Sequence, residues 1–333
     1  MRISQMKHVL AVVEHGTFST AAKKLFISQP SLSESIINLE RSLGVILFDR
    51  SSYPVRLTPA GELYVKTASQ IIDLGKSLQR ELGDIGERPQ GRLSVGSSQF
   101  VTTYIMAHIL TSLREKFPKI QVSLVENLGK EREEATLKGT IDLFFTTSLE
   151  RSEQLEYVTA MHERILLALP PMHPLNLPDA RARQEQIILP AIKARRYPLE
   201  SMPEEQDFPH IDLGSLRDDN FVMLRSSLTL HKLALKMCRE CGFTPNILLE
   251  SQSIDATRSM AIAGLGCSFI PETLIRYSDY FRHPIYYQIH PFLPVRTLEI
   301  AFRKNRYRSR AMQEFIKTTH EVLSAPVVSL QSI

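Results

Sequence analysis

Residues 16–50 read GTFSTAAKKLFISQPSLSESIINLERSLGVILFDR and contain the pattern of two helices joined by a tight turn. Ser28 is a favoured N-cap residue, and Pro30 in the following turn costs little because that turn needs no amide donor. Gly44 ends this helix. Its apolar stripe lies opposite a polar outer face, as is typical of the second helix of a helix-turn-helix, and consists of Leu32, Ile36, Leu39 and Leu43.

Two shorter helices are predicted before Ser28. The first ends at Gly16, and the second covers residues from about 18 to 25, where Thr17 or Ser19 can cap it. The residues expected to pack inward from these helices are Met6, Val9, Leu10, Val13, Ala21 and Ala22. After the third helix, residues 47–57 suit a hairpin that forms a basic wing.

A long helix is predicted after this hairpin, because Thr58 and Pro59 suit its cap and first turn. Alternating spacings of four and three residues make a heptad seam of Tyr64, Ala68, Ile71, Gly75, Leu78, Leu82 and Ile85. A lone helix gains little from an uncovered stripe, so a second copy of the chain is expected against it. The alternative is that the stripe packs on its own chain. A linker with several glycines follows at residues 83–91.

The overall composition is that of a globular protein. The chain has 333 residues, 43% apolar and 23% charged, which excludes disordered, collagen-like and disulfide-rich classes and favours two or three domains. Apolar runs such as residues 9–13 are too short for a membrane span or a signal peptide, and three cysteines fit a reducing compartment, so a cytoplasmic protein is expected. The net charge is +4, and residues 1–60 carry seven Lys and Arg against four Asp and Glu, which favours a nucleic-acid contact there.

From residue 92 onward, strand patterns alternate with helix patterns, which indicates an α/β fold. The expected strands cover residues 93–95, 122–125, 141–146, 165–169, 221–224, 247–249, 267–270 and 298–302, and the expected helices lie near 101–116, 229–241, 255–263 and 309–323. A strand, a serine pair and a helix occur twice, which predicts two similar lobes with polar helix starts on opposite walls of one cleft. Residues 177–213 carry five prolines and are predicted to form an insertion or lid outside the core.

Together these stretches resemble a LysR-type transcriptional regulator. The resemblance rests on residues 16–50, RLTPAG at 56–61, PPMHPL at 170–175 and AGLGCSFIP at 263–271, and it covers nearly the whole chain. It implies a cytoplasmic homodimer or homotetramer in which an all-α winged helix-turn-helix and a long linker helix precede an α/β effector domain of two Rossmann-like lobes, like those of periplasmic binding proteins. By analogy, the parts are the DNA-binding domain at 1–58, the linker helix and hinge at 59–90, and an effector domain at 91–325, with one lobe at 91–166 and 271–325 and the other at 167–270.

Contacts with double-stranded DNA are expected on the face of the third helix opposite its apolar stripe, and on the wing. The residues are Gln29, Pro30, Ser31, Ser33, Glu34, Ile37 and Asn38 on the helix, and Arg50 and Arg56 on the wing. Glu34 departs from the family, where this position is commonly basic; its carboxylate repels phosphate but can accept a hydrogen bond from cytosine. A capping box of Ser31 with Glu34 is the alternative, and solvent exposure is the alternative for the two arginines.

Contacts with a small-molecule effector are expected where helices begin, because free N–H groups and the positive helix end favour a small anion such as a carboxylate. Physical reasoning and the resemblance together give Ser97, Ser98, Gln99, Thr102, Thr146, Thr147, Arg225, Ser226, Ser227 and Ser253. Arg225 would add a bidentate clamp. For each serine alone, a simple N-cap is the alternative.

No cofactor, metal ion or membrane contact is predicted. Cys238 and Cys241 have no second ligand pair and are expected to be small residues on a partly buried helix, and Cys267 is expected in the core. The basic residues in 303–310 are expected to be a solvated helix start rather than a second DNA patch. Two rivals to a regulator are an enzyme acting on a small acid, which lacks a nucleophile with a base, and a transport binding protein, which lacks a signal peptide.

Overall fold

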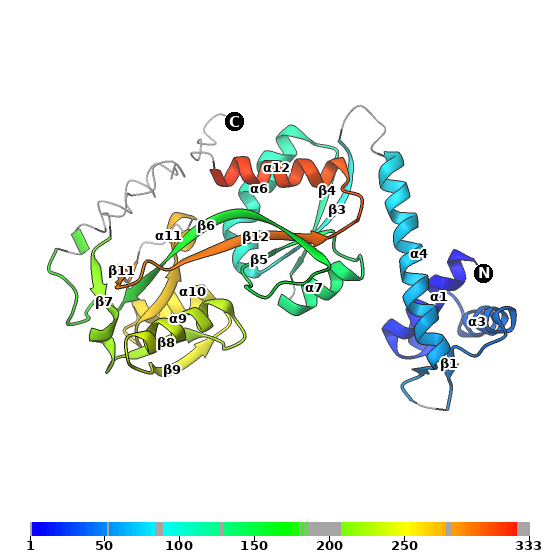
Figure 1. The fold of residues 1–333 in the computed structure, drawn as a ribbon, viewed down its shortest axis with the longest axis horizontal. Helices are drawn as coiled ribbons and strands as arrows, with labels where there is room; N and C mark the ends of the chain where they lie inside the picture. Colours follow the sequence, from blue (N-terminus) through cyan, green and yellow to red (C-terminus); the bar gives the residue numbers. More distant parts are fainter. Residues whose placement is uncertain are drawn as a thin grey trace. The chain divides into compact units, whose positions relative to one another are not determined.

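The computed structural model describes residues 2–51, 53–83, 89–126, 129–179, 181–182, 184, 208–277 and 282–324. The chain divides into two compact units, residues 1–87 and residues 88–333 (Figure 1). The first unit is mainly helical, and the second mixes helices with a large sheet.

The first unit is a helix-turn-helix with a wing and a long following helix. Its elements are α1 (Ile3–His15), α2 (Phe18–Lys24), α3 (Gln29–Leu43), β1 (Phe48–Asp49), β2 (Arg56–Leu57) and α4 (Pro59–Gly83). Strands β1 and β2 pair antiparallel and form the predicted hairpin. The Thr17 hydroxyl accepts a hydrogen bond from the Thr20 amide at 3.1 Å and so caps α2.

The core of this unit contains most of the residues that the sequence predicted. Two of them are placed differently, since Val13 is 39% exposed and Leu43 is 37% exposed. Helix α1 packs against α2, α3 and α4, so its buried face is wide and centred on Val9 and Val12 rather than on Val13. Leu43 is the last residue of α3, directly before the left-handed Gly44, and lies beyond the packed face.

The second unit is built on a mixed eight-stranded sheet with the order β4-β3-β5-β12-β6-β11-β7, in which β10 also pairs with β6. Strands β8 and β9 form a separate parallel pair. The strands are β3 (Gly91–Ser97), β4 (Ile120–Glu126), β5 (Leu143–Thr146), β6 (Leu155–Leu169), β7 (His210–Asp212), β8 (Asn220–Leu224), β9 (Asn246–Ser251), β10 (Ser268–Pro271), β11 (Ile285–His290) and β12 (Val295–Arg303). The helices are α5 (Gln99–Val101), the π-helical turn η1 (Thr102–Met106), α6 (Ala107–Lys116), α7 (Gly129–Leu137), the 3-10 turn η3 (Leu213–Leu216), α9 (Thr229–Glu240), α10 (Ile254–Ile262), α11 (Glu272–Tyr277) and α12 (Arg310–Ser324).

Two long antiparallel strands, β6 and β12, run through both lobes of this unit (Figure 1). The first lobe holds β3, β4 and β5 with α5, η1, α6, α7 and α12, and the second lobe holds β7 to β11 with α9 and α10. The chain therefore passes between the lobes twice, and both passages lie within strands. The predicted bounds put residues 271–325 in the first lobe, whereas the pairing of β11 with β7 and with the end of β6 groups residues 285–290 with the second lobe. The boundary at residue 166 stays a prediction.

The predicted strands and helices are present, but several elements were missed. Strands β7 and β11, the first part of β6, and helices α7 and α11 were not predicted. Helix α7 was missed because the run of charged residues at 130–134 gives it no clear apolar periodicity. Strand β7 was missed because it lies in the segment that the sequence analysis assigned to an insertion. That assignment is wrong at the end of the segment, because Phe208 and Leu213 are buried and β7 pairs in parallel with β11. Residues 185–207 of the segment lie outside the described residues.

Candidate functional site

The outer face of α3 is polar and exposed. The Ser28 hydroxyl accepts a hydrogen bond from the Ser31 amide at 3.3 Å and is the N-cap, as predicted. The capping box of Ser31 with Glu34 is therefore wrong. It would need Ser31 at the N-cap and its amide free for Glu34, but Ser28 is the N-cap and accepts the hydrogen bond of the Ser31 amide. The predicted readout residues lie on this face: Gln29, Pro30, Ser31, Glu34, Ile37 and Asn38 are exposed, and Ser33 is half-buried.

Two polar contacts hold α3 in place. The His8 ring nitrogen Nδ1 lies 2.7 Å from the Ser35 hydroxyl and ties α1 to α3. Burial lowers the pKa of His8, so the imidazole is neutral at physiological pH. The Arg41 guanidinium donates to the Asn38 side-chain oxygen at 3.0 Å, which fixes Asn38 at the end of the exposed face.

The wing is anchored by one carboxylate. Glu40 accepts hydrogen bonds from the amides of Leu47 and Phe48 at 2.8 and 3.3 Å, and it pairs with Arg50 at 2.9 Å. The Arg50 guanidinium also lies 5.4 Å from the Phe18 ring centre. Arg50 thus has a structural role that neither sequence alternative included. Arg56, also predicted on the wing, is exposed on β2.

The start of α4 packs tightly against the wing. The Thr58 hydroxyl donates to the Ile46 carbonyl at 2.6 Å and accepts from the Gly61 amide at 3.0 Å, which confirms it as the cap. A Cβ at Gly61 would lie 2.1 Å from the Leu47 carbonyl oxygen, so only glycine fits this contact.

The heptad seam of α4 has two different environments. Tyr64 and Ala68 pack on the core of their own unit, as the alternative proposed. Further along the helix, Leu78 and Leu82 are 55% and 58% exposed, and the neighbouring Leu74 is 72% exposed. Ile85 lies outside the described residues. The second part of the stripe is therefore not covered by the rest of its own unit.

In the first lobe, the end of β3 and the start of α5 bring three predicted residues together. The Ser98 hydroxyl accepts from the Val101 amide at 3.3 Å, so this serine is an N-cap. Ser97 is fully buried, and its hydroxyl bonds to the Ser98 carbonyl at 3.1 Å and to the Thr102 hydroxyl. Gln99 is exposed beside them.

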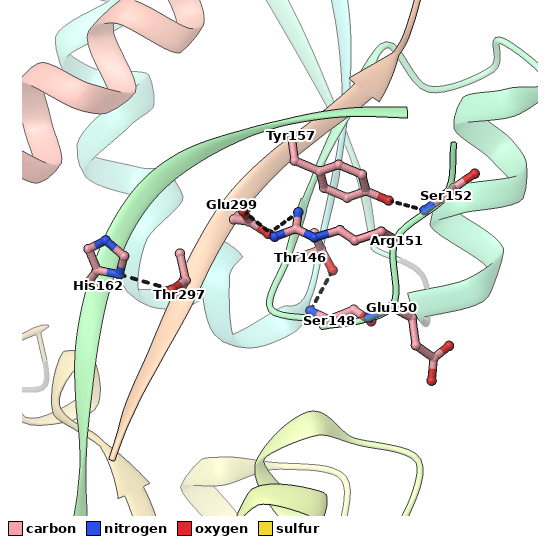
Figure 2. A network of polar contacts seen from close by, with 9 residues as sticks. All are labelled: Thr146, Ser148, Glu150, Arg151, Ser152, Tyr157, His162, Thr297 and Glu299. Carbon is pink, nitrogen blue, oxygen red and sulfur yellow. Dashed lines mark hydrogen bonds and ion pairs between the residues drawn. The ribbon is translucent and has the colours of Figure 1, made fainter. Parts of the chain in front are cut away.

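The loop after β5 is fixed to the crossing strands, as Figure 2 shows. Thr146 is buried at the end of β5, its hydroxyl accepts from the Ser148 amide at 3.1 Å, and Thr147 follows half-buried. Arg151 makes two bonds to Glu299 on β12, at 2.7 and 2.9 Å, and lies 4.3 Å from the Tyr157 ring centre. Sequence reasoning missed this pair, because its members are far apart in the chain and each occurs in an ordinary charged context.

In the second lobe, the predicted repeat of the serine cap is wrong. Arg225, Ser226 and Ser227 are exposed, and α9 begins only after Leu228, which has no side-chain cap bond. The second lobe instead places Ser253 at a helix start, where its hydroxyl accepts from the Ala256 amide of α10 at 3.3 Å.

Two polar contacts join the lobes, and neither was predicted. The Tyr104 hydroxyl of η1 donates to Asp255 in the first turn of α10. The Lys232 ammonium of α9 lies 3.3 Å from a carboxylate oxygen of Glu150, in the loop after β5. The helix start at Ser98 is thereby brought toward the helix start at Ser253.

Two of the three cysteines are buried, whereas the basic cluster lies at the surface, where Lys304 and Arg308 are exposed. Cys238 and Cys267 are buried as expected, and burial raises the pKa of each thiol to about 12. Within the described ranges, no three His, Cys, Asp or Glu side chains are grouped as a metal site would need.

In the basic cluster, Arg308 pairs with Glu156 at 2.6 Å and covers the Phe302 ring. None of the described helices has the length and apolar character to cross a bilayer.

A winged helix-turn-helix followed by a two-lobed α/β domain defines a class of transcription regulators. Residues 3–62 match the family described as "Bacterial regulatory helix-turn-helix protein, lysR family", and residues 86–324 match the "LysR substrate binding domain". The chain therefore belongs to the LysR family of transcriptional regulators.

Relatives match along nearly the whole chain. An uncharacterized HTH-type transcriptional regulator, YcgK of Bacillus subtilis (strain 168), is 30% identical over 97% of this chain and 95% of its own. A probable RuBisCO transcriptional regulator of Cyanidium caldarium is 28% identical over 96% and 93%. Among solved structures, full-length OxyR from Pseudomonas aeruginosa has a TM-score of 0.69 at 22% identity, covering 98% of this chain and 99% of its own. CbnR complexed with its target DNA has a TM-score of 0.59 at 21% identity, covering 97% and 100%.

Proposed function

We propose that this regulator contacts its operator through the exposed face of α3 and through Arg56 on the wing. The observation that carries this proposal is the Ser28 cap, which leaves the polar side chains of the first turns of α3 exposed. Residues at this end of a recognition helix reach base edges in the major groove. The similarity to CbnR, solved with its target DNA, supports the same geometry.

The effector is a small anion that binds between the lobes, beside Ser98, Thr102, Thr146, Thr147 and Ser253. These polar groups gather at helix starts and strand ends, where ligands of α/β sheets bind. An anion that fits one lobe arrangement better than another shifts the population toward it, and α4 transmits the change to the DNA-binding units. The contacts Tyr104–Asp255 and Lys232–Glu150 are the ones that such a rearrangement would alter.

Two copies of the chain associate through the uncovered stripe of α4, in a homodimer or within a homotetramer. Leu78 and Leu82 expose apolar surface that a second helix would bury. A Leu78→Lys variant should shift the molar mass measured by light scattering from the oligomer toward the monomer. An unchanged mass would remove α4 from the interface. In this proposal the chain is a cytoplasmic DNA-binding protein with no catalytic role of its own.

The operator is found by selecting bound fragments from genomic DNA, and the proposal is then tested on those fragments. Arg56→Ala and Ser33→Ala should each weaken binding at least fivefold, and Arg56→Ala should also reduce the salt dependence, because it removes a phosphate contact. Glu14→Gln, an exposed change at the end of α1, serves as the control. If both variants bind the selected fragments as tightly as the wild-type chain, the assigned DNA surface is wrong.

A further inference from the structure

Arg132 is a buried arginine with unpaired donors. It lies in the first turn of α7, and the whole residue is only 9% exposed. Its Nε and Nη1 atoms are out of contact with solvent, and no group in the described part of the chain accepts a hydrogen bond from them. Buried donors of this kind are rarely left unpaired, because losing hydration without a replacement costs free energy.

Other inward-facing arginines of the same unit have partners. Arg164 makes two hydrogen bonds to Glu272, at 2.9 and 3.0 Å. Arg296 pairs with Glu163 at 2.5 Å. A buried guanidinium normally has such a counter-charge, since an isolated buried charge is costly. Burial lowers the pKa of Arg132 to about 10, and the guanidinium is still charged at neutral pH.

The side chain of Arg132 lies against β3, with its Cδ beside Gly96. A Cβ built on Gly96 would lie 2.8 Å from the Phe144 Cβ, so Phe144 requires the glycine, and it would lie at an ordinary contact distance of 3.4 Å from the Arg132 Cδ. Gly96 directly precedes Ser97, and Phe144 is two residues before Thr146. Because β3 and β5 are parallel, their carboxyl ends share one edge, where ligands of such sheets bind.

We propose that Arg132 holds the anionic group of the effector, and that this group is a carboxylate or a similar small oxyanion. An oxyanion accepts the hydrogen bonds that the Nε and Nη1 atoms lack, and the positive end of α7 favours the same charge. This inference rests on the proposed function, and it replaces Arg225 as the main charged anchor. Arg225 is exposed, and a contact there is weakened by solvent.

A ligand anchor and a structural arginine differ in what their removal does to the melting temperature. A structural arginine stabilises the fold, so its removal lowers the melting temperature. An arginine that lacks its counter-charge destabilises the ligand-free fold, so Arg132→Met should keep or raise the melting temperature in chloride buffer. The matched control is Arg114→Met, an exposed arginine on α6 of the same lobe.

The experiment uses the full chain in acetate, succinate, phosphate and sulfate, each compared with chloride at equal ionic strength. At least one oxyanion should raise the melting temperature of the wild-type chain by several degrees. Arg132→Met should lose this increase, and Arg114→Met should keep it. The proposal is overturned if Arg132→Met melts well below wild type in chloride, if its oxyanion response persists, or if no oxyanion stabilises the wild-type chain.

Operator binding by the wild-type chain is measured in the same buffers. If the chain binds the selected DNA but the oxyanion results go against Arg132, the inference fails and the proposed function stands. If the chain prefers no DNA fragment over random competitor, it is the proposed function that fails.

Discussion

Tyr104 in the first lobe donates a hydrogen bond to Asp255 in the second lobe, and the two residues are 151 positions apart in the chain. Tyr104 belongs to the π-helical turn η1, which continues the helix capped by Ser98. Asp255 lies in the first turn of α10, which Ser253 caps. Single π-helical turns are frequent at functional sites. This contact therefore links two helix starts, one in each lobe, whose serines the sequence proposed for the effector.

Replacing Tyr104 with phenylalanine removes only the hydroxyl of this contact. A hydrogen bond to a charged acceptor contributes about 1.5–3 kcal/mol, and water can partly replace it at the half-exposed Asp255, so the unfolding free energy should fall by about 1–2 kcal/mol. Urea denaturation measures this loss, and small-angle scattering should show a larger radius of gyration. Tyr53→Phe, on the exposed wing, is the control. Identical midpoints and scattering for Tyr104→Phe and wild type would show that the contact does not hold the lobes together.

A methyl group at Gly61 should disrupt the wing. The added Cβ would meet the Leu47 carbonyl oxygen at 2.1 Å, and this backbone cannot move without displacing the hairpin. Gly61→Ala should therefore cost about 2–3 kcal/mol, as overpacking does, and weaken DNA binding. Gly75→Ala is the matched change in the same helix, where nothing lies within 4 Å of the new Cβ. It should raise stability by up to about 1 kcal/mol through helix propensity. Equal thermal unfolding of the two variants would contradict the packing described for the wing.

Removing the charge of Glu34 should change how the protein discriminates DNA. The structure leaves this carboxylate exposed and outside any cap, so it faces whatever binds α3. Two unit charges at contact distance interact by about 1 kcal/mol in water, so Glu34→Gln should tighten binding to random duplex DNA about fivefold at low salt. The preference for selected fragments should shrink correspondingly. Fluorescence anisotropy at two salt concentrations measures both effects, and Glu14→Gln should show neither. Weaker binding of Glu34→Gln to random DNA would indicate that Glu34 organises the helix instead.

The sequence predicted the first unit almost completely, because its helices follow from local rules. Ser28, Pro30 and Gly44 mark one helix by cap and turn chemistry that needs no distant partner. In the second unit the same rules failed at Ser226 and Ser227, because Leu228 follows them and occupies the N-cap position of α9. Nothing in the local sequence marks Tyr104 and Asp255, or Arg151 and Glu299, as partners. Arg132 was hidden for a similar reason, since its lack of a counter-charge is visible only once the whole lobe is packed around it.

The buried thiols should make stability fall at high pH. Burial raises the pKa of Cys238 and Cys267 to about 12, whereas a thiol in the unfolded chain titrates near 8.5. Above about pH 8.5 the unfolded state loses these protons and the native state keeps them, so each thiol reduces the unfolding free energy by up to about 1.4 kcal/mol per pH unit. Urea denaturation at pH 8 and pH 10 measures the decline. The double variant Cys238→Ala, Cys267→Ala keeps every other titrating group, so its unfolding free energy should fall less than that of wild type over the same range. If the unfolding free energies of wild type and the double variant decline equally, the two thiols ionise in the native state as they do in the unfolded state. That result would contradict their burial in a packed core.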